Sequence, residues 1–147
     1  MAPAFNQYQE ENIMTTTKTI DTGAYAATLL RLTLGIALLA HAYLKVFVFT
    51  LPGAAAFFAS QGFPGWSVYP VVAVEVLTGI ALVLGLQARI AAIISLPVLL
   101  GALSVHAPNG WVFTSPNGGW EYPAFMVVTA IAIALLGNGA FALSKAK

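Results

Sequence analysis

One carboxylate stands inside a long apolar run and is the residue of this chain best placed to do chemistry. Glu75 lies within residues 68–86, between Val74 and Val76. About 20 apolar residues span a bilayer as a helix, so this run is long enough to cross one. A charged side chain at the centre of such a helix costs about 2.5 to 3.5 kcal/mol on the insertion scale. Glu75 is therefore either paired with a cation from another helix or protonated, and both states make it a candidate functional residue.

Two histidines and a lysine supply further groups that can bind or transfer protons. His41 and Lys45 are four residues apart, so they share one face of a helix, and His106 follows another apolar run. Imidazole and carboxylate groups are the usual general acids and bases, and we therefore name Glu75, His41 and His106 as candidate catalytic residues. The candidate substrate- or partner-binding residues are Arg31, Lys45, Asn109, Glu121 and Tyr122.

Most of these residues also have a purely structural interpretation. His41 fits an interfacial histidine, and Lys45 fits a membrane anchor. His106 fits a cation at a helix C-terminus, where it favours the helix dipole. Glu121 fits a charge in a first helical turn, next to a proline that favours the same position. A structural role is hardest to defend for Glu75.

The composition indicates the environment that must hold these residues. Of 147 residues, 59% are hydrophobic and 7% are charged, whereas soluble domains carry roughly 25% charged residues. The chain has too few charges to cover a surface facing water, so we predict an integral membrane protein. The net charge of +1 gives no sign of nucleic-acid binding. The absence of cysteine excludes thiolate nucleophiles, disulfides and thiolate-held metals, and no metal site or resident cofactor is predicted.

Four apolar runs predict an all-α fold, a four-helix bundle embedded in the lipid bilayer. The expected spans are 25–47, 68–86, 89–106 and 121–138. The second and third are so close that they must form a tight antiparallel hairpin. Pro97 predicts a kink that neighbouring helices tolerate, and residues 53–60 are compatible with a short helix at the membrane interface.

The chain divides into a polar N-terminal tail (1–22), a membrane domain (23–144) and a short C-terminal tail (145–147). The first 20 residues lack the basic flank and apolar core of a signal peptide, and we expect them to be mobile. Met14 is an alternative start of the protein, because the residues after it lead directly into the first span.

The distribution of basic and aromatic residues predicts the orientation. Four spans place both termini on one side, and that side carries more lysine and arginine than the other, so the positive-inside rule puts both termini in the cytoplasm. The residues on that side are Lys18, Arg89, Lys145 and Lys147. Aromatic residues gather at the opposite boundary, as in an interfacial belt; they are Trp66, Tyr69, Trp111, Trp120 and Tyr122.

The polar residues are expected to converge in the outer half of the bundle. At 1.5 Å rise per residue, Glu75 lies roughly 10 Å below the outer boundary, and the other candidates occur at the outer ends of their spans. Arg31 is the exception, because it lies near the inner boundary. It is expected either to extend to the cytoplasmic interface or to reach Glu75. The carboxylate is then ionised if Arg31 or Lys45 pairs with it, and neutral otherwise.

In their order along the chain, these residues resemble the DoxX family of small bacterial membrane proteins with four spans, over about residues 27–144. The residues that carry the resemblance are Leu30-Arg31-Leu32, Gly35, His41, Lys45, Gly62-Phe63-Pro64, Glu75, Gly79, Leu82, Gly85, Ala88-Arg89, His106, Asn109-Gly110, Gly118-Gly119, Glu121-Tyr122 and Gly137-Asn138-Gly139. The chain has Ala42 where the family usually has glycine and Asn138 where it often has proline. It also lacks the family's C-terminal aspartate after Ser144, which removes any role for that carboxylate.

The resemblance implies a multi-pass protein of the bacterial plasma (inner) membrane, labelled in many relatives as an oxidoreductase subunit. It suggests an enzyme subunit that acts with quinone as substrate and with a sulfur donor such as thiosulfate. The alternatives are a non-catalytic anchor or assembly partner of a redox-stress complex and a small proton-coupled transporter. A haem between His41 and His106 is a further alternative. A redox protein partner and a homo-oligomer both remain open.

Overall fold

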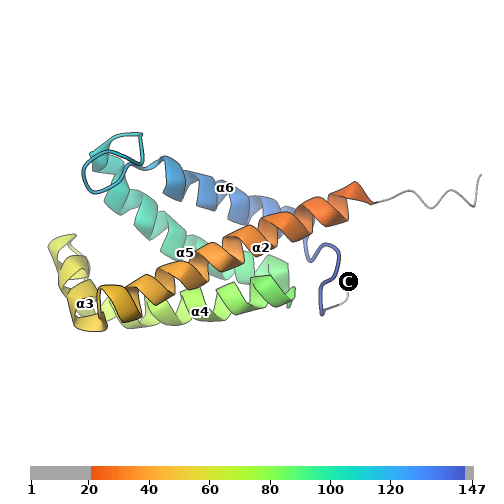
Figure 1. The fold of residues 1–147 in the computed structure, drawn as a ribbon, viewed down its shortest axis with the longest axis horizontal. Helices are drawn as coiled ribbons and strands as arrows, with labels where there is room; N and C mark the ends of the chain where they lie inside the picture. The colour runs from red at the N-terminus through yellow and green to blue at the C-terminus, as the bar shows by residue number, and fades with distance from the viewer. Residues whose placement is uncertain (1–20, 145–147) are drawn as a thin grey trace, which may run out of the picture.

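Four long helices lie alongside one another in a bundle in the computed structural model, which describes residues 21–144 (Figure 1). The helices are α2 (Thr22–Tyr43), α4 (Val68–Leu84), α5 (Ala88–His106) and α6 (Glu121–Leu136). A shorter helix, α3 (Leu51–Ser60), follows α2 after a turn of π-helix, η1 (Leu44–Val48). No strand occurs between residues 21 and 144, so the predicted all-α fold is confirmed.

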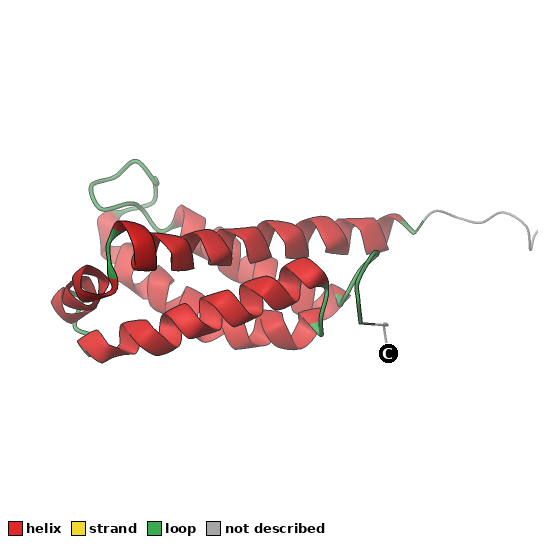
Figure 2. Cartoon of the chain, turned by 60° about the horizontal axis from the view of Figure 1, so that its bottom comes forward, coloured by secondary structure: helices red, strands yellow, loops and turns green. Residues whose placement is uncertain are grey.

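The bundle has two different ends (Figure 2). At one end lie α3 and the loop 110–120, and we call this the loop end. At the other end, which we call the terminal end, α2 begins and the segment 137–144 finishes the described chain. Residues 1–20 of the predicted tail 1–22, the predicted tail 145–147 and the alternative start at Met14 lie outside the described residues; Asp21 and Thr22 of the predicted tail begin α2.

The helix boundaries follow from local capping chemistry. The carboxylate of Asp21 accepts a hydrogen bond from the Ala24 N–H at 3.0 Å and so begins α2. Gly85 ends α4 in a left-handed conformation with φ 70°, which glycine adopts without steric cost. Gln87 follows at φ 47°, and α5 starts at the next residue. This short connection forms the tight antiparallel hairpin that the sequence predicts.

The core is apolar and contains one close helix crossing. Leu34, Leu38, Leu82, Leu99 and Ile133 are at most 2% exposed and pack together between the four helices. The crossing lies between α2 and α4 at two glycines. A Cβ atom added at Gly35 would lie 2.9 Å from the Gly79 carbonyl oxygen, so small residues there allow the two backbones to approach closely.

Three of the helical segments are long and apolar enough to cross a membrane by length and composition: Thr22–Val48, Gly65–Leu84 and Ala88–Asn109. The outer faces of the helices carry large apolar side chains, such as Leu29, Leu77 and Val128, each more than 60% exposed. Such surfaces suit lipid rather than water. α6 is shorter than the predicted span 121–138, since it ends at Leu136, and its 16 residues extend about 24 Å.

The short helix α3 and the proline inside α5 are both features that the sequence analysis anticipates. The short helix expected at 53–60 is present as α3, which begins two residues earlier at Leu51. Pro97 lies inside α5, and the helix continues through it to His106. Membrane helices tolerate such prolines because neighbouring groups satisfy the freed carbonyl.

Candidate functional site

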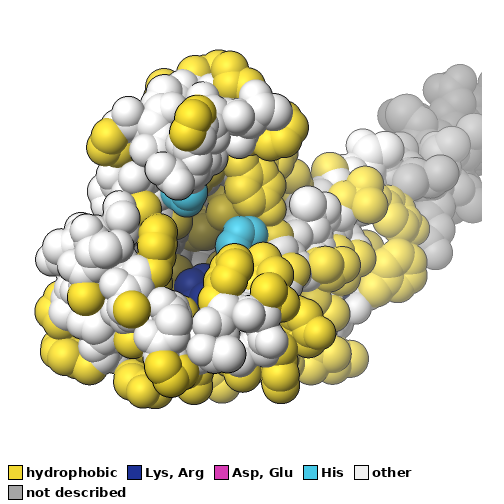
Figure 3. Space-filling model, turned by 60° about the vertical axis from the view of Figure 1, so that its left-hand side comes forward, with side chains coloured by type: hydrophobic (Ala, Val, Ile, Leu, Met, Phe, Trp, Pro, Cys, Tyr) yellow, Lys and Arg dark blue, Asp and Glu magenta, His cyan; other side chains and the backbone are white. Residues whose placement is uncertain are grey.

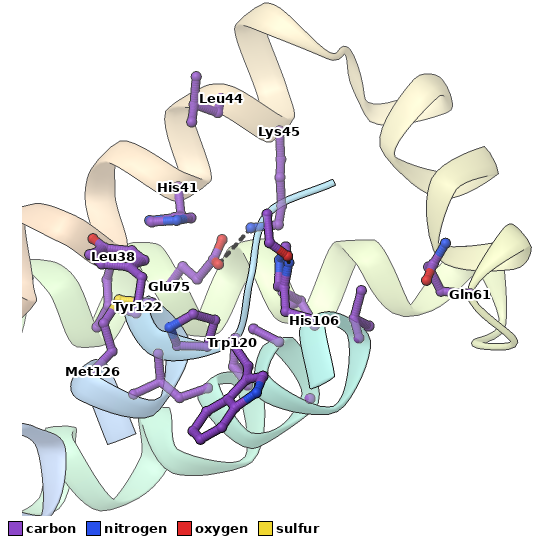
Figure 4. A pocket seen from close by; sticks show the side chains of 18 of the residues that line it. Leu38, His41, Leu44, Lys45, Gln61, Glu75, His106, Trp120, Tyr122 and Met126 are labelled. Atoms are coloured by element: carbon purple, nitrogen blue, oxygen red, sulfur yellow. Dashed lines mark hydrogen bonds and ion pairs between the residues drawn. The ribbon is translucent and has the colours of Figure 1, made fainter. Parts of the chain in front are cut away.

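An ion pair joins two of the candidate residues. The Lys45 Nζ lies 2.7 Å from the Glu75 Oε1 (Figure 4). The side chain of Glu75 is 5% exposed and that of Lys45 is 17% exposed. Lys45 therefore supplies the cationic partner that a carboxylate inside an apolar run requires.

Lys45 reaches Glu75 from an unusual piece of backbone. It is the second residue of the π-helical turn η1, which is closed by a hydrogen bond from the Phe49 N–H to the Leu44 carbonyl. Thr50 follows with φ 62° and ψ 150°, a region that is almost restricted to glycine. π-Helical turns and strained residues cluster at functional sites, and here the turn carries the lysine and the strained Thr50 lies between that turn and α3.

A large cavity opens at the loop end of the bundle, with a volume of about 1680 Å³. Figure 3 shows the hollow from that side, with histidine and lysine surfaces inside an otherwise mostly apolar wall. Six of the eight candidate residues lie along it: His41, Lys45, Glu75, His106, Glu121 and Tyr122. These residues come from η1 and all four long helices, so the fold brings together groups that are up to 81 positions apart, from His41 to Tyr122.

Both histidines have one ring nitrogen already engaged. The Nδ1 of His41 lies 2.7 Å from the Ala37 carbonyl oxygen, and the Nδ1 of His106 lies 3.0 Å from that of Gly118. A carbonyl oxygen only accepts hydrogen bonds, so Nδ1 carries the proton in each ring. In the neutral form, Nε2 is then an acceptor. The His41 ring also stacks on Tyr122, with ring centroids 6.0 Å apart and an interplanar angle of 19°.

One oxygen of Glu75 has no hydrogen-bond partner among residues 21–144. Its Oε2 is buried and accepts no hydrogen bond, while Oε1 holds the lysine. An unsatisfied buried acceptor costs about 1 to 3 kcal/mol, and more when it is charged. Figure 4 shows the carboxylate beside the same hollow that His41 and Tyr122 face. Glu75 lines the cavity, but its Oε2 has almost no accessible surface and is enclosed by protein atoms.

Two of the predicted binding residues hold the loop 110–120 in place. The Asn109 Nδ2 donates to the Gly118 carbonyl oxygen at 2.9 Å, and Asn109 does not line the cavity. The Glu121 Oε1 accepts the Phe113 N–H at 2.7 Å. These contacts give both side chains a structural role at the cavity rim.

Arg31 belongs to the other end of the molecule. Its Nη1 donates to the carbonyl oxygens of Leu82 and Val83, each at 2.8 Å, and its Nη2 donates to that of Ala140 at 3.0 Å. The residue is 2% exposed. The expectation that Arg31 reaches Glu75 is therefore wrong, because backbone carbonyls hold its guanidinium and Lys45 pairs with Glu75. Arg31 joins the C-terminal carbonyls of α4 to the segment 137–144, and it lies away from the cavity.

The segment 137–144 also gives a structural role to Asn138, one of the departures from the family pattern. The Asn138 Oδ1 accepts the Ala88 N–H at 2.8 Å and satisfies a free donor at the start of α5. The Ser144 hydroxyl donates to the Gly85 carbonyl oxygen at 2.8 Å and accepts the Gln87 N–H at 2.9 Å. Asn138 and Ser144 therefore stabilise the α4–α5 turn through side-chain amide and hydroxyl groups.

Sequence reasoning missed part of the cavity wall. Phe57 and Phe58 of α3, Trp120 and Gly101 all line it. The aromatic residues were assigned to an interface helix or an aromatic belt, and no polar signal marked them as part of a site. A Cβ atom added at Gly101 would meet nothing within 4 Å, so this glycine contributes open space.

The residues between 21 and 144 contain no group of three or more histidine, cysteine, aspartate or glutamate side chains that could hold a metal ion.

Comparison with known proteins gives one family match: the model of the DoxX family matches residues 26–108. No curated protein and no solved structure matches the chain. The matched region covers more than half of the sequence and runs from within α2 to just past the end of α5, so it includes His41, Lys45, Glu75 and His106. The chain belongs to the DoxX family.

Proposed function

We propose that this chain is the quinone-binding subunit of a membrane oxidoreductase. The observation that carries the proposal is the apolar cavity of about 1680 Å³ that has Lys45, Glu75 and His41 on its wall. Sites for small molecules are typically concave and mostly apolar, with volumes of about 300–1,000 Å³ and a few convergent polar groups. The larger volume here leaves room for the apolar tail of a lipid-soluble ligand beside its polar head.

The polar groups suit proton exchange with a quinone. Reduction of a quinone to a hydroquinone takes up two electrons and two protons. His41 has its Nδ1–H fixed by the Ala37 carbonyl, which leaves Nε2 to carry a proton to or from the ligand. The Lys45–Glu75 pair is the second proton exchanger. The electrons come from a partner protein, because the chain has no cysteine and is predicted to hold no redox cofactor.

The charges of the site favour a neutral ligand head. Lys45 is neutralised by Glu75, and Arg31 is buried at the terminal end. Among the described residues, an anionic sulfur donor such as thiosulfate therefore finds no unpaired lysine or arginine along the cavity. We place the oxidation of such a donor on the partner subunit, with the two electrons that it releases passing to the quinone.

We also propose an arrangement of the helices in the membrane. α6 is the fourth span, so both termini lie in the cytoplasm and the loop end faces outward across a bacterial plasma membrane. A 16-residue helix is short for a core of about 30 Å. Local bilayer thinning accommodates such a span at modest cost.

A non-catalytic anchor is the second candidate, and one observation favours it. Trp111 and Phe113 of the loop 110–120 are 55% and 66% exposed at the loop end, where a partner could dock. Proton-coupled transport has less support. The bundle contains a packed apolar core around Leu34, Leu82 and Ile133, and the smaller pocket at the terminal end, of about 390 Å³, shares no lining residue with the cavity.

Ligand binding to purified protein tests the proposal. A short-chain benzoquinone should bind saturably in nanodiscs, quench the fluorescence of Trp120 and raise the unfolding temperature. Gly101→Phe fills the cavity at a position with free space and should abolish this binding, whereas Gly101→Ala should retain it. Helix content and thermal unfolding check that both variants fold. Absence of saturable binding, or equal binding by folded Gly101→Phe, would contradict the proposal.

A further inference from the structure

The segments that form the loop end carry no charged side chain. Aspartate, glutamate, lysine and arginine are all absent from residues 46–74, which include α3, and from residues 107–120. These segments nevertheless present large aromatic side chains, all at least 50% exposed: Phe47, Phe49, Phe57, Trp66, Trp111 and Phe113. Soluble domains carry roughly 25% charged residues, so an uncharged and aromatic surface of this extent does not suit bulk water.

The cavity is also continuous with the outer surface of the bundle. Val128 of α6 is 64% exposed on the apolar outer face, and it lines the cavity as well. Phe125 on the same helix is 61% exposed and has the same double position. In Figure 1, α5 and α6 diverge from α2 and α4 toward the loop end. The cavity is therefore open along α6 to the surroundings of the apolar outer face, which suits lipid.

We infer that the loop end is immersed in the lipid of one leaflet and that a phospholipid acyl chain occupies the cavity when no other ligand is bound. The volume is sufficient, because an apolar cavity of about 150 Å³ already holds a benzene ring and this one measures about 1680 Å³. The charged groups along the described part of the wall are already engaged: Lys45 pairs with Glu75, and Glu121 accepts the Phe113 N–H. A bound water needs roughly 2–4 polar partners, so a mostly apolar space suits an alkyl chain better than water.

Lipid fits this surface better than a protein partner does. A protein interface typically has an apolar centre within a polar rim, whereas the uncharged segments here extend across the loop end and join the outer face along α6. Tryptophan and tyrosine favour the headgroup level of a bilayer, and Trp66, Tyr69 and Trp111 belong to these segments. In this arrangement the polar tip of the loop 110–120, residues 114–117, lies among the headgroups within reach of water.

Immersion of the loop end decides how a ligand reaches the cavity. Because lipid surrounds the mouth, a ligand first dissolves in the bilayer and then replaces the acyl chain. Any apolar ligand takes this route, so the resident occupant and the entry path do not depend on whether the ligand is a quinone.

The three tryptophans of the chain report on this end of the molecule alone. They are Trp66, Trp111 and Trp120, and the last two line the cavity. The variant Trp66→Phe/Trp111→Phe leaves Trp120 as the single fluorophore, in the cavity wall. In nanodiscs of phospholipids with brominated acyl chains, we expect its fluorescence to fall to half or less of the value in unbrominated lipid, and aqueous iodide to quench it by less than a tenth. Quenching by iodide that equals or exceeds quenching by brominated lipid overturns the inference.

Filling the cavity distinguishes an acyl chain inside it from lipid around it. Gly101→Phe occupies free space in the wall, so in the same tryptophan background it should reduce the quenching of Trp120 by brominated lipid at least twofold. Gly101→Ala should leave the quenching unchanged. Helix content and thermal unfolding check that both variants fold, and unreduced quenching in folded Gly101→Phe overturns the inference.

A phospholipid with a photoreactive group on its acyl chain tests the wild-type protein without any substitution. Mass mapping should find crosslinks at wall residues such as Ala102 and Val105, and labelling confined to outer-face residues such as Leu29 and Leu77 overturns the inference. No quinone enters these measurements. Their failure therefore leaves the proposed function to its own binding test, and a failure of quinone binding leaves the lipid-filled cavity standing.

Discussion

Removing Lys45 from the ion pair should lower the free energy of unfolding strongly, because it leaves a buried carboxylate without its counter-charge. Lys45→Met leaves the Glu75 carboxylate, which is 5% exposed, without its counter-charge. Breaking a buried pair by removing one partner costs about 3 to 5 kcal/mol. Because Lys45 is 17% exposed and sits at the cavity wall, we place the loss at the lower end, about 3 kcal/mol.

A double-mutant cycle isolates the interaction. Glu75→Gln should cost less than Lys45→Met, because the amide oxygen still accepts from the ammonium. The double variant Lys45→Met/Glu75→Gln contains no buried charge at this site, so its loss should fall short of the sum of the single losses by at least about 1.5 kcal/mol. Groups in direct contact typically show coupling of this size.

The free energy of unfolding can be measured for all four proteins in mixed micelles, by titration with a denaturing detergent and circular dichroism at the helix signal. The reasoning is refuted if Lys45→Met costs less than about 0.5 kcal/mol, the range of ordinary surface substitutions. Strict additivity of the two single losses would also refute it, since additivity is the mark of groups that do not interact.

Three further predictions concern the scaffold. Arg31→Lys should lower stability by about 2 to 4 kcal/mol, because a lysine cannot serve all three carbonyls that the guanidinium binds; detergent unfolding measures the loss, and a neutral result would contradict the assigned role. Gly35→Ala should cost about 1 to 3 kcal/mol, since its Cβ would lie 2.9 Å from the Gly79 carbonyl oxygen. The matched change Gly101→Ala meets nothing within 4 Å and should be neutral or gain up to about 1 kcal/mol, so equal effects at the two glycines would argue against the close crossing. The chain has no cysteine, so Ser115→Cys gives a single thiol in the loop 110–120; a membrane-impermeant maleimide should label it in intact cells, and labelling only after lysis would reverse the proposed orientation.

The helices could be predicted from the sequence because apolar length, turn residues and caps are local signals. Glu75 was recognisable as a group in need of a cation for the same reason. Which of Arg31 and Lys45 pairs with Glu75 was not predictable, because the answer depends on the local path of the backbone around Lys45 and on a long-range contact of Arg31. Lys45 lies in the π-helical turn Leu44–Val48, and a regular helical period does not describe that turn.

The role of Arg31 depends on the segment 137–144, which folds back on α2 and α4. The Ala140 N–H donates to the Ala24 carbonyl oxygen at 3.0 Å, and this contact brings the Ala140 carbonyl within reach of the guanidinium. Contacts between residues more than 100 positions apart leave no mark in local periodicity. The cavity was unpredictable for a similar reason, since its wall depends on where α3 lies after the strained Thr50.

The most direct test of the central claim is photo-crosslinking with a light-activated benzoquinone, followed by mass mapping of the labelled peptides. The account predicts labelling within the cavity-lining stretches 53–58, 97–106 and 120–126, and suppression of that labelling by an excess of unlabelled hydroquinone and by Gly101→Phe. Labelling confined to exposed outer-face residues such as Leu29 and Leu77, with no competition by the hydroquinone, would contradict it.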